Sequence, residues 1–370
     1  MKIHFVMMIH DDTPSGGRKI IYSYANYLAE KGNDVKITFI ADAPYHQRRY
    51  NKLAEIKHMM NYVHMKSKQK QVTWYPLSDK IVLETVPVLK DAIRNNDGSE
   101  KIIFTDFSFP ISYQEHIGKL TNNMFYFIQH DEAVYARESI VREAWKLNIK
   151  KIVVASWLKK EIEKYSDQVY LVKNYTEVKK FYLTKPFSKR DKVVSMIYHT
   201  LPAKGTSDGL RAMKIIKENI PDTTMILFGT PDRPKELPDD YIYYKCANSD
   251  LLREAVYNQS RVFIMPSLKE GWGLVATEAM ACGAALVSTY NGGVDDFAIN
   301  RETALLSEPK DYQALAKNTI ELLDSPALNK KIAGDGRLEV NKLLFQNSAL
   351  NFEKILKEGP AIEGIELDGN

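Results

Sequence analysis

The feature that most constrains the fold is an alternation of short apolar runs with longer amphipathic segments. Several of the runs are continuously apolar, which is typical of strands covered on both faces in a parallel sheet. The predicted strands are Ile3–Ile9, Val35–Ile40, Lys101–Thr105, Met124–Ile128, Ile152–Ala155, Val169–Val172, Val193–Ile197, Thr224–Phe228, Val262–Met265 and Ala285–Ser288. The predicted helices between them include Arg18–Glu30, Leu158–Tyr165, Leu210–Asn219, Leu251–Asn258 and Tyr312–Leu323. Strand, crossover helix and next strand, repeated, predicts a doubly wound α/β fold.

The length of the chain predicts more than one domain. At about 150 residues per domain, 370 residues correspond to two domains. The periodicity is lost over residues 174–192, a segment that contains Pro186 and is interpreted as a linker. We therefore expect two Rossmann-like domains, residues 1–185 and 186–345, facing each other across a cleft. Residues 346–370 are expected to form a C-terminal helix, which could cross back to the first domain, and a frayed tail.

Charge and composition exclude several classes of function. Lys and Arg number 51 against 47 Asp and Glu, and a net charge of +4 is too small to indicate a nucleic-acid partner. No apolar run approaches the roughly 20 residues of a membrane span, so a cytoplasmic protein, at most peripheral to the inner face of the membrane, is expected. Cys246 and Cys282 are both interpreted as small buried hydrophobic residues of a reducing compartment.

A basic segment, residues 46–70, has no obvious place in the sheets. Its lysines and arginines could lie against anionic lipid, with Met59, Met60 and Tyr62 adding apolar contacts. A solvated helix packed on the first domain is the alternative.

Glycines follow the first predicted strand, in Asp11-Asp12-Thr13-Pro14-Ser15-Gly16-Gly17. Glycines here let backbone amides approach a ligand, and the N-terminus of the next helix favours an anion. The segment contains neither a Gly-x-Gly-x-x-Gly fingerprint nor a P-loop ending. An anion site and an ordinary strand-to-helix turn both fit Gly16 and Gly17.

The corresponding loop of the second half is His199-Thr200-Leu201-Pro202-Ala203-Lys204-Gly205. Lys204 stands before a glycine and just ahead of a predicted helix, where it can reach a phosphate with help from nearby amides. A solvated surface lysine is the alternative interpretation. The position of Lys204 at the carboxyl end of a predicted strand favours a ligand contact.

The most informative segment begins at the end of Val262–Met265 and runs from Pro266 to Ala281. Gly271 and Gly273 favour a loop with exposed amides, and a helix is expected from Leu274 to Cys282. Glu270 and Glu278 could accept hydrogen bonds from hydroxyls at two ends of an elongated ligand. The alternative is a solvated Glu270 and a Glu278 paired with a neighbouring base. The apolar character of the helix around Glu278 favours the ligand interpretation.

This segment, Pro-Ser-x-x-Glu-Gly-x-Gly-Leu-x-x-x-Glu-Ala-Met-Ala-x-Gly, resembles the Glu-x7-Glu signature of retaining family 4 glycosyltransferases (glycosyl transferases group 1). The resemblance implies the GT-B fold, with the acceptor bound mainly by the N-terminal domain and a nucleotide sugar by the C-terminal one. It implies that Glu270 contacts donor-sugar hydroxyls and Glu278 the ribose, while Lys204 and the amides around Gly273 and Leu274 hold the diphosphate. The catalytic residues implied are Glu270, His130 and Lys204; the donor-binding residues implied are Gly16, Gly17, His199, Lys204, Gly271, Gly273, Leu274 and Glu278. The segments 291–293 and 303–306 match later parts of the family's C-terminal domain.

The chain departs from the family pattern at two places. His199 stands where the family usually has an arginine, so the diphosphate could lose a cation or take one from Arg233 or Arg18. Asp295-Asp296 replaces the common Pro-Glu.

The function implied by the resemblance is transfer of a sugar from a UDP-, dTDP- or GDP-sugar to a hydroxyl of a saccharide or lipid-linked acceptor, in cell-surface polysaccharide or glycoconjugate assembly. The chain contains no Asp-x-Asp, which predicts an enzyme that needs no metal and no cofactor besides its nucleotide-sugar co-substrate. The alternatives are a catalytically silent partner of an active transferase and a GT-B nucleotide-sugar epimerase. A dinucleotide-dependent oxidoreductase fits the α/β pattern but lacks its phosphate fingerprint.

Overall fold

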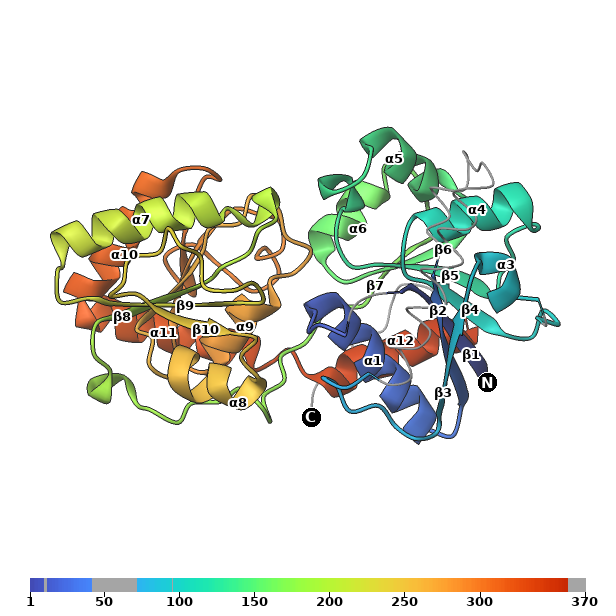
Figure 1. Cartoon of the computed structure of the whole chain (residues 1–370), viewed down its shortest axis with the longest axis horizontal. Helices are drawn as coiled ribbons and strands as arrows, with labels where there is room; N and C mark the ends of the chain where they lie inside the picture. Colours follow the sequence, from blue (N-terminus) through green and yellow to red (C-terminus); the bar gives the residue numbers. More distant parts are fainter. Residues whose placement is uncertain (10–11, 42–71, 95, 359–370) are drawn as a thin grey trace.

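The chain forms two parallel β-sheets, each covered by helices on both faces, in two halves of an elongated molecule (Figure 1). The computed structural model describes residues 1–9, 12–41, 72–94 and 96–358. The predicted basic segment, residues 46–70, lies outside the described residues, as does most of the C-terminal tail. The predicted two-sheet α/β architecture is confirmed.

The first sheet has seven strands in the order β3-β2-β1-β4-β5-β6-β7, and all its pairings are parallel. Its strands are β1 Lys2–Met8, β2 Asp34–Ile40, β3 Ile81–Val86, β4 Lys101–Phe104, β5 Met124–Ile128, β6 Lys150–Val153 and β7 Val169–Leu171. Its helices are α1 Gly16–Glu30, α3 Leu89–Ala92, α4 Ser108–His116, α5 Glu138–Lys146 and α6 Ser156–Ile162, with a 3₁₀ turn η2 at Glu132–Val134.

The second sheet has six parallel strands in the order β10-β9-β8-β11-β12-β13. Its strands are β8 Val193–Ile197, β9 Thr224–Gly229, β10 Ile242–Lys245, β11 Val262–Met265, β12 Ala285–Thr289 and β13 Ala304–Ser307. Its helices are α7 Thr206–Asn219, α8 Ser249–Leu251, α9 Leu274–Ala281, α10 Tyr312–Asp324 and α11 Pro326–Val340; α8 runs on into a π-helical turn η5 at Leu252–Tyr257, and 3₁₀ turns η3 and η4 cover Phe187–Lys189 and Pro202–Lys204.

Strand order reverses at one place in each sheet. In the second sheet β8 lies between β9 and β11. The chain continues from β8 toward one edge of the sheet and from β11 toward the other, so the loops after these two strands begin side by side and then diverge. In the first sheet β1 lies between β2 and β4 in the same way. Such switch points at the carboxyl ends of strands are where ligands of open α/β sheets bind.

Each predicted strand is present, with boundaries within two residues of those expected. The strands that sequence patterns missed are β3, β10 and β13. The edge strands β3 and β10 are partly exposed, and their apolar runs, Ile81–Leu83 and Ile242–Tyr244, are only three residues long. A run this short does not distinguish a strand from a loop. The same holds for β13, which is fully buried but has only four residues.

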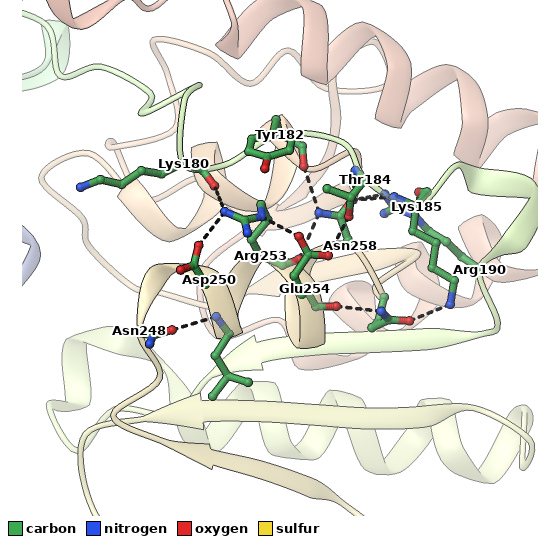
Figure 2. Close-up of polar contacts among 12 residues, drawn as sticks. Lys180, Tyr182, Thr184, Lys185, Arg190, Asn248, Asp250, Arg253, Glu254 and Asn258 are labelled. Carbon is green, nitrogen blue, oxygen red and sulfur yellow. Dashed lines mark hydrogen bonds and ion pairs between the residues drawn. The ribbon is translucent and has the colours of Figure 1, made fainter.

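The linker packs tightly on the second domain after residue 180 (Figure 2). Asn258 accepts hydrogen bonds from the amides of Thr184 and Lys185, and Arg253 donates to the carbonyl of Lys180. Arg190 is fully buried and donates to carbonyls of Lys185, Ser260 and Cys282, because a buried guanidinium must have its donors satisfied. These bonds fix residues 180–190 to the second domain.

The last described helix, α12 Phe345–Glu358, lies against α1 in the first domain (Figure 1). Its buried residues Ala349, Phe352 and Leu356 recur at helical spacing and form one apolar face. The Phe352 ring stacks on Tyr24, with ring centroids 4.4 Å apart and planes at 5°. The Ser348 hydroxyl donates to the carbonyl of Lys173 at 2.7 Å, so the helix also contacts the crossover from the first domain.

The two cysteines differ in their surroundings. Cys282 is buried, and burial raises the pKa of its thiol to about 12. Cys246 follows β10 and is exposed, so the sequence-based expectation that both are buried was wrong for Cys246. The run that contains Cys246 belongs to an edge strand, whose end faces solvent.

Phe352→Ala should lower the free energy of unfolding by about 3–5 kcal/mol, because it removes a fully buried aromatic side chain and leaves a cavity between α12, α1 and the sheet. Urea-induced unfolding measures the change. Leu350→Ala on the exposed face of the same helix is the matched control and should cost under about 0.5 kcal/mol. Equal losses in the two variants would show that α12 is not anchored through Phe352.

Candidate functional site

Lys204 and Glu270 come from the loops that follow the adjacent strands β8 and β11. The Lys204 ammonium contacts both oxygens of Glu270 at 2.8 Å. The Ser267 hydroxyl donates to the same carboxylate at 2.8 Å. Glu270 is only 9% exposed, so its charge requires the nearby ammonium and hydroxyl.

The close approach of these two loops depends on Gly205. Its backbone φ of 63° is in the left-handed region that favours glycine. A Cβ at this position would lie 2.0 Å from the carbonyl oxygen of Pro266. The bare backbone therefore allows the Lys204 loop to pack directly on the Glu270 loop.

Glu278 lies on α9, a helix that begins at Leu274 immediately after Gly273. Its carboxylate accepts a hydrogen bond from the Tyr257 hydroxyl at 3.1 Å and pairs with the Lys19 ammonium at 2.9 Å. From the sequence, the alternative is a Glu278 paired with a base and a solvated Glu270. The structure shows a base beside Glu278, but Glu270 is buried and paired as well.

His130 follows β5 and lies beside the Glu270 loop. A Cβ on Gly271 would come within 3.0 Å of the His130 Cβ and 1.8 Å of the carbonyl oxygen of Gln129, so only a glycine permits this contact between the domains. Burial, together with the positive charge of Lys204, lowers the pKa of His130 to about 4, and the opposing charges of Glu270 and Asp131 do not compensate. His130 is therefore neutral near pH 7.

The glycine loop of the first domain meets the N-terminus of α9. A Cβ on Gly16 would lie 3.1 Å from Leu274, and the carbonyl of Gly17 accepts a hydrogen bond from the Gln129 side chain at 3.0 Å. Because α1 begins at Gly16 and α9 at Leu274, the N-terminal ends of two helices meet at one place. Both ends carry partial positive charge, which suits an anion between them.

His199 follows β8, and its Nδ1 accepts a hydrogen bond from the backbone amide of Leu201 at 3.0 Å. Burial and the charge of Lys204 lower its pKa, against the effect of Glu270. His199 is thus a neutral group that presents Nε2–H and supplies no second cation. Arg233, considered from the sequence as a substitute, donates instead to the carbonyls of Tyr241 and Pro238, and Arg18 donates to that of Thr13.

Charged groups that the sequence did not single out join the two domains around this site. Lys269 pairs with Asp131 at 2.6 Å, and the two Asp131 oxygens accept hydrogen bonds from Nη1 and Nη2 of Arg142, each at 2.8 Å. Burial would raise the pKa of Asp131, but the hydrogen bonds from Arg142 and Lys269 outweigh it and lower the pKa to about 2. Asp131 is therefore a charged anchor next to His130.

A second set of contacts involves Asp296, one of the positions where the chain departs from the family pattern. Its carboxylate accepts a hydrogen bond at 2.7 Å from the backbone amide of Ser156, the first residue of α6. It also pairs with the Lys173 ammonium at 2.8 Å. The Trp157 indole donates to the carbonyl of Gly271 at 3.0 Å. These partners lie more than 100 residues apart in the sequence, and no local pattern connects them.

The structure thus brings together Lys204, Glu270, His199 and His130, which influence one another electrostatically. Gly271 contacts this group through His130, and Gly16 contacts Leu274. Glu278 lies on the same helix as Leu274, with Lys19 and Tyr257 around it.

Residues 1–9, 12–41, 72–94 and 96–358 contain no group of three or more His, Cys, Asp or Glu side chains that could hold a metal ion. Within these ranges, every helix is too short or too polar to cross a bilayer.

Two parallel α/β domains with polar groups gathered at the carboxyl ends of both sheets define the GT-B fold. Sucrose-phosphate synthase from Thermosynechococcus elongatus has the same architecture, with a TM-score of 0.72, 17% identity, and 97% of this chain and 99% of that chain covered. Anabaena HepE in complex with UDP and glucose gives a TM-score of 0.71 at 14% identity, covering 97% of this chain and 100% of that one.

Residues 178–338 match the family model described as glycosyl transferases group 1. The glycosyltransferase CapM of capsular polysaccharide biosynthesis in Staphylococcus aureus is 24% identical over 178 residues, which is 45% of this chain and 47% of CapM. The D-inositol 3-phosphate glycosyltransferase of Corynebacterium glutamicum is 24% identical over 189 residues, 47% of this chain and 45% of that protein. The match therefore spans about half the length of these curated relatives. The family resemblance expected from the Glu-x7-Glu segment is confirmed.

The neutral His130 should make stability fall in mild acid. Above pH 6.5 the imidazole is neutral in both states; between pH 6.5 and about 4 the unfolded chain binds a proton that the folded chain does not, so stability is lost as the pH falls. His130→Gln removes this contribution. The melting temperature of the variant should therefore fall less steeply than that of the wild type between pH 7 and pH 4.5.

His116→Gln, at an exposed position at the end of α4, is the control and should keep the wild-type slope. If His130→Gln also keeps that slope, His130 is not held neutral by its surroundings.

Proposed function

We propose that the chain is a retaining glycosyltransferase that moves a sugar from a UDP-, dTDP- or GDP-sugar to a hydroxyl of a saccharide or lipid-linked acceptor. The observation that carries the proposal is the Lys204–Glu270 pair at the switch point of the second sheet, with His130 beside it from the first domain. A paired ammonium and carboxylate can part to meet a ligand that has both an anionic and a hydroxyl-bearing end.

The roles follow from charge and position. Lys204 and the amides at the N-termini of α9 and α1, around Gly273, Leu274, Gly16 and Gly17, would hold the diphosphate. Glu270 and the backbone at Gly271 would hold the donor sugar, and Glu278 the ribose. His199 would donate a neutral hydrogen bond from Nε2. Entry of the diphosphate would release Glu270 from Lys204 and leave the carboxylate available for sugar hydroxyls.

The chemistry is cleavage of the bond between the anomeric carbon and the diphosphate oxygen. Negative charge grows on the leaving diphosphate, and positively charged groups placed beforehand stabilise it. We propose that Lys204 and the helix N-termini supply this stabilisation without a metal. The acceptor hydroxyl attacks from the face that the diphosphate leaves, and the departing phosphate takes its proton, so the configuration is retained. No side chain is needed as a nucleophile, and His130 contacts the reacting groups in its neutral form.

The choice of substrates is supported by the ligands bound in two similar structures and by the name of one relative. HepE was solved with UDP and glucose, and Staphylococcus aureus TarM with UDP and α-GlcNAc-glycerol; TarM has a TM-score of 0.66 at 12% identity. CapM is named for capsular polysaccharide biosynthesis. We propose by analogy a role in the assembly of a cell-surface polysaccharide or glycoconjugate.

The cellular placement is proposed on the same basis. Nucleotide sugars are made in the cytoplasm, so the protein would act there. Peripheral contact with an anionic membrane is a sequence-based prediction that concerns residues 46–70, outside the described part of the chain.

Lys204→Ala and Glu270→Gln should each lower kcat/KM for the nucleotide sugar by about 10²–10³-fold, because each removes a group that faces charge or hydroxyls in the transition state. Donor turnover is measured with the nucleotide sugar that most raises the melting temperature in a screen, since a ligand that binds the folded state stabilises it.

The control is Lys214→Ala on the outer face of α7, where the side chain is exposed. The kcat/KM of this variant should stay within about twofold of the wild-type value. Near-wild-type rates for both Lys204→Ala and Glu270→Gln would remove the assignment. If an epimerised nucleotide sugar forms when no acceptor is present, the protein is an epimerase and the proposed transfer activity is wrong.

Activity should survive dialysis against a chelator, because Lys204 and the helix N-termini take the place that a divalent cation has in metal-dependent transferases. Rates are compared before and after EDTA treatment, and again after adding Mg²⁺ or Mn²⁺. A loss on chelation that either metal restores would contradict metal independence.

A further inference from the structure

Lys19 is a buried charge that the proposed roles leave unused. It lies on α1, and its ammonium contacts carboxylates from two other parts of the chain: Glu278 of α9 at 2.9 Å, and Glu177 of the crossover between the domains. The ammonium also lies 5.4 Å from the centre of the Phe181 ring. The Lys19 side chain is 15% exposed, and a lysine buried to this degree needs a specific partner.

α1 and α9 contact each other at a second place besides the Lys19–Glu278 pair. Gly16 of α1 packs on Leu274 of α9, and Lys19 pairs with Glu278. Leu274 and Glu278 lie one turn apart on α9, and Gly16 and Lys19 lie nearly one turn apart on α1. α9 therefore has its N-terminus at the proposed diphosphate site and carries Glu278 one turn further along.

Glu278 retains capacity for a ligand in this arrangement. One of its oxygens accepts from Lys19 and the other from the Tyr257 hydroxyl. A carboxylate has about four lone-pair positions, so each oxygen can accept one more hydrogen bond. A pair of neighbouring hydroxyls, such as those of a ribose, can therefore bind to Glu278 while Lys19 stays in place.

The electrostatics favour a fixed ion pair. Burial by itself would lower the pKa of Lys19, but the negative charges of Glu278 and Glu177 outweigh it and raise the pKa above the usual lysine value. Lys19 is therefore charged near neutral pH. Without this charge, Glu278 would lose its ion pair and Glu177 would keep only Lys180.

We propose that Lys19 is a positioning residue for nucleotide binding. It belongs to the N-terminal domain and pairs with the carboxylate of Glu278 in the C-terminal domain. It orients Glu278 toward the ribose hydroxyls, so the ribose part of the site is complete only when the two domains are in contact. This inference rests on the proposed function, in which Glu278 binds the ribose of the donor.

The test measures nucleotide binding to the full chain by calorimetry, with UDP, GDP and dTDP as probes. For the nucleotide that binds the wild type, Lys19→Met should raise Kd by tenfold or more, which corresponds to about 1.4 kcal/mol. Lys19→Arg keeps the charge and should bind within about threefold of the wild type. In donor turnover, Lys19→Met should raise KM by a larger factor than it lowers kcat, because it acts on nucleotide binding.

Glu177→Gln is the matched control, because it removes the other partner of Lys19 and leaves the Lys19–Glu278 pair intact. Its Kd should stay within about threefold of the wild type. If Glu177→Gln and Lys19→Met weaken binding equally, Lys19 acts on the crossover and the inference is wrong. Circular dichroism checks folding, and Lys19→Gln replaces Lys19→Met if the latter does not fold.

The remaining outcomes separate this inference from the proposed function. A wild type that binds none of the nucleotides overturns both. A wild type that binds one of them, with a Lys19→Met variant that binds equally or more tightly, overturns only the role of Lys19 and leaves the Lys204–Glu270 site as proposed.

Discussion

Buried carboxylates at the junction of the domains need cations, and this requirement organises the site. Glu270, Glu278, Asp131 and Asp296 are each largely buried, and an isolated buried charge is too costly to keep. Each is matched by a lysine: Lys204, Lys19, Lys269 and Lys173. In all of these pairs except Lys204–Glu270, the two partners come from different domains. Of the pairs that join the domains, only Lys19–Glu278 includes a carboxylate proposed to bind the donor.

Backbone contacts make this arrangement compact. Gly205 lets the loops after β8 and β11 touch, and Gly271 lets the second domain pack on the backbone of Gln129 and His130. A side chain at Gly205 would separate the Lys204 loop from the Glu270 loop, and one at Gly271 would separate the two domains. Gly271 of the signature segment therefore allows the close approach of one domain to the other.

Sequence patterns predicted most of the strands that are buried on both faces. β13 is an exception, because it is fully buried but was missed. β5 and β11 are continuously apolar and fully buried, and both were predicted with their observed boundaries. β3 and β10 lie at sheet edges, where one face is open to solvent and the apolar run is interrupted. The exposed position of Cys246 at the end of β10 was missed for the same reason.

The sequence by itself determined the α/β class through local periodicity, and Glu270 and Glu278 through their spacing within one loop and helix. Lys204 was singled out because it stands before a glycine after a predicted strand, and His130 was implied only by the family resemblance. Only the tertiary structure decided which charges are paired, that His130 and His199 are neutral, and that Lys19 reaches Glu278 across 259 positions of the chain. The physical reason is that a pKa and an ion pair depend on burial and on neighbours in space. Those neighbours are set by the packing of whole domains, which no short stretch of sequence encodes.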